Sequence, residues 1–213
     1  MDILLYIPIL FFSVVLHEYM HGYVAYRCGD DTAYLMGRLT FNPAAHVDMW
    51  GTIIIPAMCY ISGLPMFGWA KPVPVNYYRL HNPKNDMAKV SLAGPLSNVF
   101  LIVVAALLLK ILIIADYNAV PVLSKALVYM IAVNLMLSIF NLIPIPPLDG
   151  SKVLAALLPT PLSVKYMRLE RFSMIIIIVL IVSGAFRLIL VPLFNFFFSL
   201  ILTFIGAGNV KLF

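Results

Sequence analysis

Long apolar runs alternate with short polar segments along this chain. Most of the runs reach about 20 residues, which is the length an α-helix needs to cross the hydrocarbon core of a bilayer. The clear runs cover residues 4–27, 87–115, 120–143 and 172–206. The last run is divided weakly near Arg187 and Pro192, and it predicts two helices, at 172–190 and 191–205. The pattern predicts an all-α polytopic membrane protein with five or six transmembrane helices.

The number of crossings depends on segment 50–67. It is apolar but short, and Pro56, Gly63 and Pro65 interrupt it, so it either crosses the bilayer or enters and returns. Lys and Arg near span ends favour the cytoplasm. If segment 50–67 crosses, nine of the 14 Lys and Arg residues lie on one face of the membrane and five on the other. If it is re-entrant, eleven lie on one face and three on the other. The re-entrant arrangement is favoured. It predicts five crossings, with the N-terminus outside and the C-terminus inside.

The polar region between the first two long runs predicts extended chain. Segments 33–41 and 69–76 combine β-branched or aromatic residues with Gly and Pro, a mixture that favours edge strands or loops over helix. Such backbone is tolerated at membrane depth only where it is buried in protein or lines a cavity. We therefore expect a re-entrant and β region over residues 29–85, with two surface loops as the alternative. Segment 161–172 predicts a short interfacial helix.

The composition indicates that lipid surrounds most of this chain. Hydrophobic residues make up 63% of it and charged residues 11%, against about 25% charged residues in an average soluble domain. The net charge of +5 comes with few basic residues in the apolar runs. It therefore indicates loop charge at a membrane face and no nucleic-acid partner. Cys28 and Cys59 predict two unpaired thiols. The first run lacks the basic start of a secretory signal, so we expect it to be a retained helix.

The most specific chemical pattern is HEYMH, from His17 to His21, inside the first run. On an α-helix two histidines four residues apart share one face and can bind one metal ion, while Glu18 beside them can move a proton. A catalytic zinc usually takes three protein ligands, so a third is needed. Asp149 closes another apolar run, after prolines that break the helix, and an acidic group at such depth is a functional candidate. These residues indicate hydrolysis within a membrane.

Together the motifs resemble those of the site-2 protease family of intramembrane zinc metalloproteases. HExxH is present at 17–21, and the NxxPxPxLDG pattern is present at 141–150. AGPLSN at 93–98 is also family-like, and GRLTFNPAAH and GWAKPVPVN are similar to a subgroup of small bacterial members. The resemblance implies a single domain over 1–213, without the PDZ or CBS domains of other members. Its core helices are then 4–27, 87–115 and 120–143.

The resemblance also implies roles for individual residues. His17, His21 and Asp149 would bind one Zn²⁺, and Glu18 would be the general base that acts on zinc-activated water. Further residues are candidates for binding substrate or steadying the developing oxyanion, with hydrogen bonding between helices as the alternative. These are Asn141 and Asn98.

Two features of the polar region remain open. His46 could be an extra zinc ligand, a gate, or an interfacial side chain beside Asp48. A substrate helix must unwind before its peptide bonds can be attacked, and an exposed strand edge could hold it extended. Segments 38–41 and 71–75 are the candidates for such a clamp.

The function that the resemblance implies is hydrolysis of peptide bonds in or near the transmembrane segments of other proteins. Such an enzyme would reside in the inner membrane of a bacterial cell, with its site toward the cytoplasm, and its partners would be transmembrane substrates and the lipid bilayer. A catalytically silent membrane regulator and a metal or proton transporter are the alternatives. A transporter, however, would be expected to place polar groups along a path through several spans.

Overall fold

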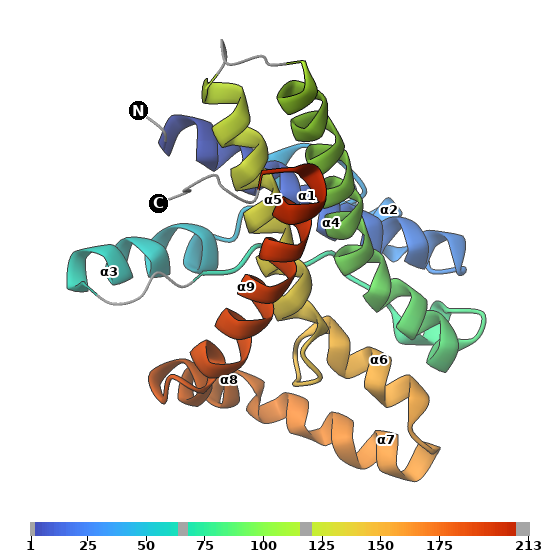
Figure 1. The fold of residues 1–213 in the computed structure, drawn as a ribbon. Coiled ribbons are helices and arrows are strands. Elements are labelled where there is room, and N and C mark those ends of the chain that lie inside the picture. Colours follow the sequence, from blue (N-terminus) through green and yellow to red (C-terminus); the bar gives the residue numbers. More distant parts are fainter. Residues whose placement is uncertain (1–2, 64–67, 116–120, 208–213) are drawn as a thin grey trace.

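The computed structural model describes residues 3–63, 68–115 and 121–207, and within these ranges it is helical with no strand. Its longest helices are α1 (Ile3–Arg27), α4 (Pro83–Ile114), α5 (Pro121–Leu142) and α9 (Ala185–Ile205) (Figure 1). Three of these, α4, α5 and α9, are long and apolar enough to cross a membrane. The predicted all-α membrane architecture is confirmed at this level.

Helices α1, α4 and α5 pack against one another, and α9 covers α5 and α4. Tyr6 stacks on Tyr129 with ring centroids 4.1 Å apart, so α1 and α5 begin at the same end of the bundle. Ala25, near the end of α1, shares a buried cluster with Val90, near the start of α4, so these two helices are antiparallel. This arrangement places the second half of α1 beside the first half of α4.

The C-terminal region differs from the two predicted spanning helices. A ten-residue helix, α8 (Ser173–Val182), is followed by Gly184 in the left-handed conformation, at φ 73°. At 1.5 Å per residue α8 is about 15 Å long, too short to cross a bilayer. The predicted division near Pro192 is wrong, because Pro192 lies inside α9 and Gly184 makes the break.

This difference changes the end of the bundle at which α9 is expected to finish. Ile205, at the end of α9, packs in the same buried cluster as Leu127, near the start of α5. The end of α9 therefore lies at the same end of the bundle as the start of α1, as Figure 1 shows. With α8 too short to cross, α9 ends at the end of the bundle where α1 starts, which differs from the predicted five-crossing arrangement; residues 208–213 lie outside the described ranges.

Segment 50–67 does not form a spanning helix in the part that the structure describes. Residues Met49–Ser62 form a short apolar helix, made of a π-helical turn (Met49–Ile54) and α3 (Ile55–Ser62). Fourteen residues extend about 21 Å, less than the roughly 30 Å of a hydrocarbon core. Figure 1 shows α3 standing away from the long helices. The short length agrees with the re-entrant interpretation; residues 64–67 lie outside the described ranges.

The predicted strands are wrong within the described residues. Segment 33–41 begins inside a short helix, α2 (Thr32–Leu35), and turns at Gly37, where φ is 65°. Segment 69–76 is extended but pairs with no strand. Pro72 and Pro74 have no N–H groups, so this segment lacks the regular donors that a sheet ladder needs.

The extended segment is instead fixed by separate hydrogen bonds. The Lys71 N–H donates to the His46 carbonyl at 2.9 Å, and the Asn76 N–H donates to the carboxylate of the fully buried Asp30 at 2.6 Å. The Arg38 guanidinium donates to the Lys71 carbonyl at 2.9 Å. The segment is therefore held by residues that follow α1, without being part of a sheet.

After α5 the chain forms three short elements at the far end of the bundle. They are α6 (Asp149–Leu157), α7 (Thr160–Met167) and a 3-10 helix, η4 (Arg168–Phe172). The last two coincide with the short helix predicted at 161–172. The Lys84 ammonium donates to the Leu158 carbonyl at 2.6 Å, which ties the start of α4 to the end of α6.

Candidate metal centre

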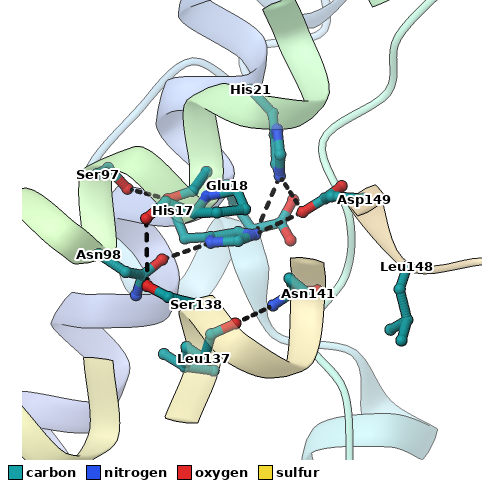
Figure 2. A network of polar contacts seen from close by, with 12 residues as sticks. His17, Glu18, His21, Ser97, Asn98, Leu137, Ser138, Asn141, Leu148 and Asp149 are labelled. Atoms are coloured by element: carbon teal, nitrogen blue, oxygen red, sulfur yellow. Dashed lines mark hydrogen bonds and ion pairs between the residues drawn. The ribbon is translucent and has the colours of Figure 1, made fainter. Parts of the chain in front are cut away.

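Three buried side chains from α1 and α6 converge on one point. His17 Nε2 and His21 Nε2 are 3.0 Å apart, and each lies 3.2 Å from Asp149 Oδ2 (Figure 2). Tetrahedral zinc with ligands at 2.0–2.2 Å would separate its donor atoms by about 3.3 Å. The structure thus brings together the three residues predicted as ligands, with spacings close to those of a zinc site.

The α1 pair is close because the two histidines are one helical turn apart. Asp149 reaches them because the chain turns sharply after α5 and begins α6 at Asp149. This turn needs a glycine at 150, where an added Cβ would lie 2.2 Å from the Leu142 carbonyl oxygen. Prolines 144, 146 and 147 occupy the turn, as the sequence predicted for a helix break.

Neighbouring oxygen atoms orient both histidine rings. His17 Nδ1 is 2.6 Å from Asn98 Oδ1, and His21 Nδ1 is 2.7 Å from the Val90 carbonyl. These oxygens only accept, so each Nδ1 carries the proton and each Nε2 presents a lone pair. Such hydrogen bonds from the second ring nitrogen are typical of metal-binding histidines.

The donor set fits a cation. Both Nε2 lone pairs and Asp149 Oδ2 face one another at 3.0–3.2 Å, and Asp149 Oδ2 is buried without a hydrogen-bond partner. Three acceptor atoms at this distance repel one another unless a positive charge lies between them. Two imidazoles and one carboxylate are a common ligand set for catalytic zinc.

Gly94 on α4 provides the space between these ligands. A Cβ at this position would lie 2.4 Å from His21 Nε2 and 2.6 Å from His17 Nε2. A methyl group there would occupy the point on which the ligand atoms converge. The AGPLSN motif contains this residue, but the steric requirement depends on how closely α1 and α4 approach and is not visible in the sequence.

Glu18 is half-buried beside the ligands and is held by the extended segment. Its Oε2 accepts a hydrogen bond of 2.9 Å from the backbone N–H of Val73. Pro72 and Pro74 flank Val73, so the Val73 N–H is the only main-chain donor across these three positions. The segment therefore supplies one directed hydrogen bond to the carboxylate.

This bond leads to a first prediction, for Val73→Pro. The substitution removes the N–H, and loss of a hydrogen bond to a charged group, worth about 1.5–3 kcal/mol, should lower kcat/KM about 10- to 100-fold. Zinc content should stay the same, because this hydrogen bond goes to Glu18 and not to His17, His21 or Asp149. Peptide cleavage and metal analysis measure the two effects. Val73→Ala is the matched control, since it shortens the side chain but keeps the N–H, and equal activity in both variants would contradict the role of this bond.

Asn141 and His46 do not join the ligand group. The Asn141 amide donates to the Leu137 carbonyl at 3.0 Å within α5, as Figure 2 shows. His46 is buried and its Nε2 donates to the Thr40 carbonyl at 2.9 Å. Asp48 accepts from the Trp50 and Gly51 N–H groups, so its carboxylate caps the following π-helical turn.

A bundle of bilayer-length apolar helices around a buried His–His–Asp group defines a membrane protein of the zinc-hydrolase class. The chain belongs to peptidase family M50, the site-2 protease family of zinc metalloproteases, whose family model matches residues 5–115 and 110–184. The resemblance that the two motifs indicated is thereby confirmed.

Relatives of very different organisms carry the words zinc metalloprotease in their names. YwhC of Bacillus subtilis (strain 168) is 36% identical over 208 residues, which is 92% of either chain. Rip2 of Mycolicibacterium smegmatis is 26% identical over 93% of this chain and 72% of its own. MJ0392 of Methanocaldococcus jannaschii is 29% identical over 70% of this chain and 33% of its own. No solved structure matches the chain.

Proposed function

We propose that this protein is an intramembrane endopeptidase that hydrolyses peptide bonds in or near transmembrane segments of other proteins. The observation that carries the proposal is the convergence of His17, His21 and Asp149, with Glu18 beside them, between helices of bilayer length. Membership of a zinc metalloprotease family supports peptide hydrolysis as the reaction. The depth of the site supports membrane-embedded substrates.

The site residues have two roles, metal binding and proton transfer. His17, His21 and Asp149 hold zinc, which when bound supplies the Lewis acid that acidifies water and polarises the scissile carbonyl. Glu18, aligned by the Val73 N–H, removes the proton from the attacking water and returns it to the departing amine. These roles require Glu18 to be ionised before attack and protonated after it.

The two asparagines contribute differently in this proposal. Asn98 uses both ends of its amide within the protein, toward His17 and toward Asn134, which favours an orienting role over substrate binding. Asn141 is the candidate donor to the substrate or to the developing oxyanion, through an amide that in this structure donates to the Leu137 carbonyl. His46 remains a candidate gate. Its side chain is buried, and its backbone carbonyl accepts a hydrogen bond from the Lys71 N–H, at the start of the segment whose Val73 contacts Glu18.

The distribution of basic residues supports a cytoplasmic location for the site. Eleven of the 13 Lys and Arg residues in the described ranges lie toward the end of the bundle where α1 ends, and the other two, Lys110 and Lys125, lie toward the opposite end. Such an excess favours the cytoplasmic face. His17 lies ten residues before Arg27, about 15 Å along α1 at 1.5 Å per residue. We propose a bacterial inner-membrane protein whose site opens toward the cytoplasm.

Cleavage by purified protein tests the proposed function. The protein is reconstituted in lipid vesicles with a panel of labelled single-span membrane proteins, and products are identified by mass spectrometry. We expect cleavage in or near the transmembrane segment, its loss after chelation, and its recovery after zinc is restored. Zinc flux across the same vesicles is measured in parallel. Flux without cleavage of any substrate by the zinc-loaded protein would contradict the proposal.

A further inference from the structure

A chain of buried hydrogen bonds leads from His17 through two asparagines to α5. His17 Nδ1 lies 2.6 Å from Asn98 Oδ1, and Asn98 Nδ2 donates to Asn134 Oδ1 at 2.8 Å. Asn134 Nδ2 donates in turn to the Met130 carbonyl at 2.8 Å and to the Ser13 hydroxyl at 2.9 Å. Both asparagines are fully buried, so solvent does not satisfy either amide.

The Met130 carbonyl fixes the direction of every bond in this chain. A backbone carbonyl can only accept, so Asn134 must turn its NH₂ group toward Met130 and its Oδ1 toward Asn98. Asn98 must then turn its NH₂ group toward Asn134 and its Oδ1 toward His17. Reversing either amide would place two acceptors or two donors face to face in a buried site. The proton of His17 is therefore held on Nδ1.

We propose that Asn134 is a positioning residue for the metal centre, acting on His17 through Asn98. By fixing the Asn98 amide it keeps the His17 ring oriented, with the Nε2 lone pair directed between His21 and Asp149. This inference rests on the proposed zinc site. Helix α5 supplies none of the three ligands, yet through Asn134 it determines the tautomer of a ligand on α1.

Zinc affinity tests the inference with Asn134→Leu, which keeps the volume of the side chain but removes both hydrogen-bonding ends. Outer partners of metal ligands typically contribute 10- to 100-fold in affinity, and we expect a weakening of about that size. The matched control is Ser138→Ala. It removes another buried bond between α5 and α4, from the Ser138 hydroxyl to the Pro95 carbonyl, that does not lead to His17. Its zinc affinity should equal that of the wild type.

The tautomer of His17 is a second readout that general loosening of the bundle does not predict. Ring ¹⁵N NMR shifts of the zinc-free protein should show the Nδ1–H form of His17 in the wild type and a mixture in Asn134→Leu. Ser13→Ala should keep the Nδ1–H form, because the Met130 carbonyl still orients Asn134. Asn134→Ala, measured in the same way, replaces the leucine variant if that protein does not fold.

The outcomes separate the inference from the proposed function. A wild type that binds no zinc at His17, His21 and Asp149 would overturn the function itself. A wild type that binds zinc, with folded Asn134 variants that bind it equally well and keep the Nδ1–H form of His17, would overturn only the positioning role. Weakened zinc binding together with a changed tautomer would support it.

Discussion

Gly94→Ala should abolish stoichiometric zinc binding while the helical bundle stays folded. The added methyl group would lie 2.4 and 2.6 Å from the two histidine Nε2 atoms, closer than Cβ contacts in real proteins. It would stand among the ligand atoms themselves. We therefore expect a loss of zinc affinity beyond the roughly 100-fold that removal of an outer partner can cause. Metal analysis of the purified protein and competition with a chelator measure the loss, and cleavage should disappear with it.

A control on the same turn of α4 shows whether the effect is local. Leu96 is 58% exposed on the outer face of the helix, and Leu96→Ala should keep full zinc content. Circular dichroism should give the same helix content for both variants. A Gly94→Ala protein that keeps one tightly bound zinc would mean that α4 lies further from the ligands than the structure has it.

Glu18→Gln should abolish cleavage without reducing zinc content. Glutamine has nearly the same shape, and its side-chain oxygen can still accept the Val73 N–H bond, so the surroundings of the site are preserved. It cannot take up a proton, and loss of a general base typically lowers the rate about 100- to 10,000-fold. Initial rates of product formation at matched zinc content measure the effect.

The matched comparison is Asp149→Asn, which makes the same carboxylate-to-amide change at a proposed ligand. It should lower zinc content as well as activity, because a neutral amide replaces the charged oxygen 3.2 Å from both histidines. A Glu18→Gln protein that cleaves at the wild-type rate would exclude Glu18 as the base. Loss of zinc in that variant would instead make Glu18 part of the metal site.

The His–His–Asp group could be predicted from sequence in two separate parts. His17 and His21 share a face by helix periodicity alone, and Asp149 stands out as an acidic residue after an apolar run. The long helices were equally visible, since length and hydropathy decide whether a segment suits a bilayer. The boundary between α8 and α9 differs from the division predicted at Arg187 and Pro192, because a spanning helix tolerates proline and Gly184 in the left-handed conformation separates the two helices.

Features that depend on how helices approach one another could not be predicted. Gly94 and Asn134 acquire their roles only when α1, α4 and α5 pack against one another, which the sequence around either position does not specify. The Val73 contact with Glu18 joins residues 55 positions apart through a backbone N–H, which has no signature in side-chain chemistry. The strands were predicted from residue preference, but a strand also needs a partner with free backbone donors.

The wide separation of the ligands along the chain has a consequence for biosynthesis. His17 and His21 lie on α1, and Asp149 lies on α6, which follows α5 along the chain. A nascent chain emerges N-terminus first, so the histidine pair enters the membrane well before its carboxylate partner is made. Because a catalytic zinc site needs all three ligands, an incomplete chain has no competent site. The His–His–Asp group is therefore complete only once α6 has been made and has packed against α4.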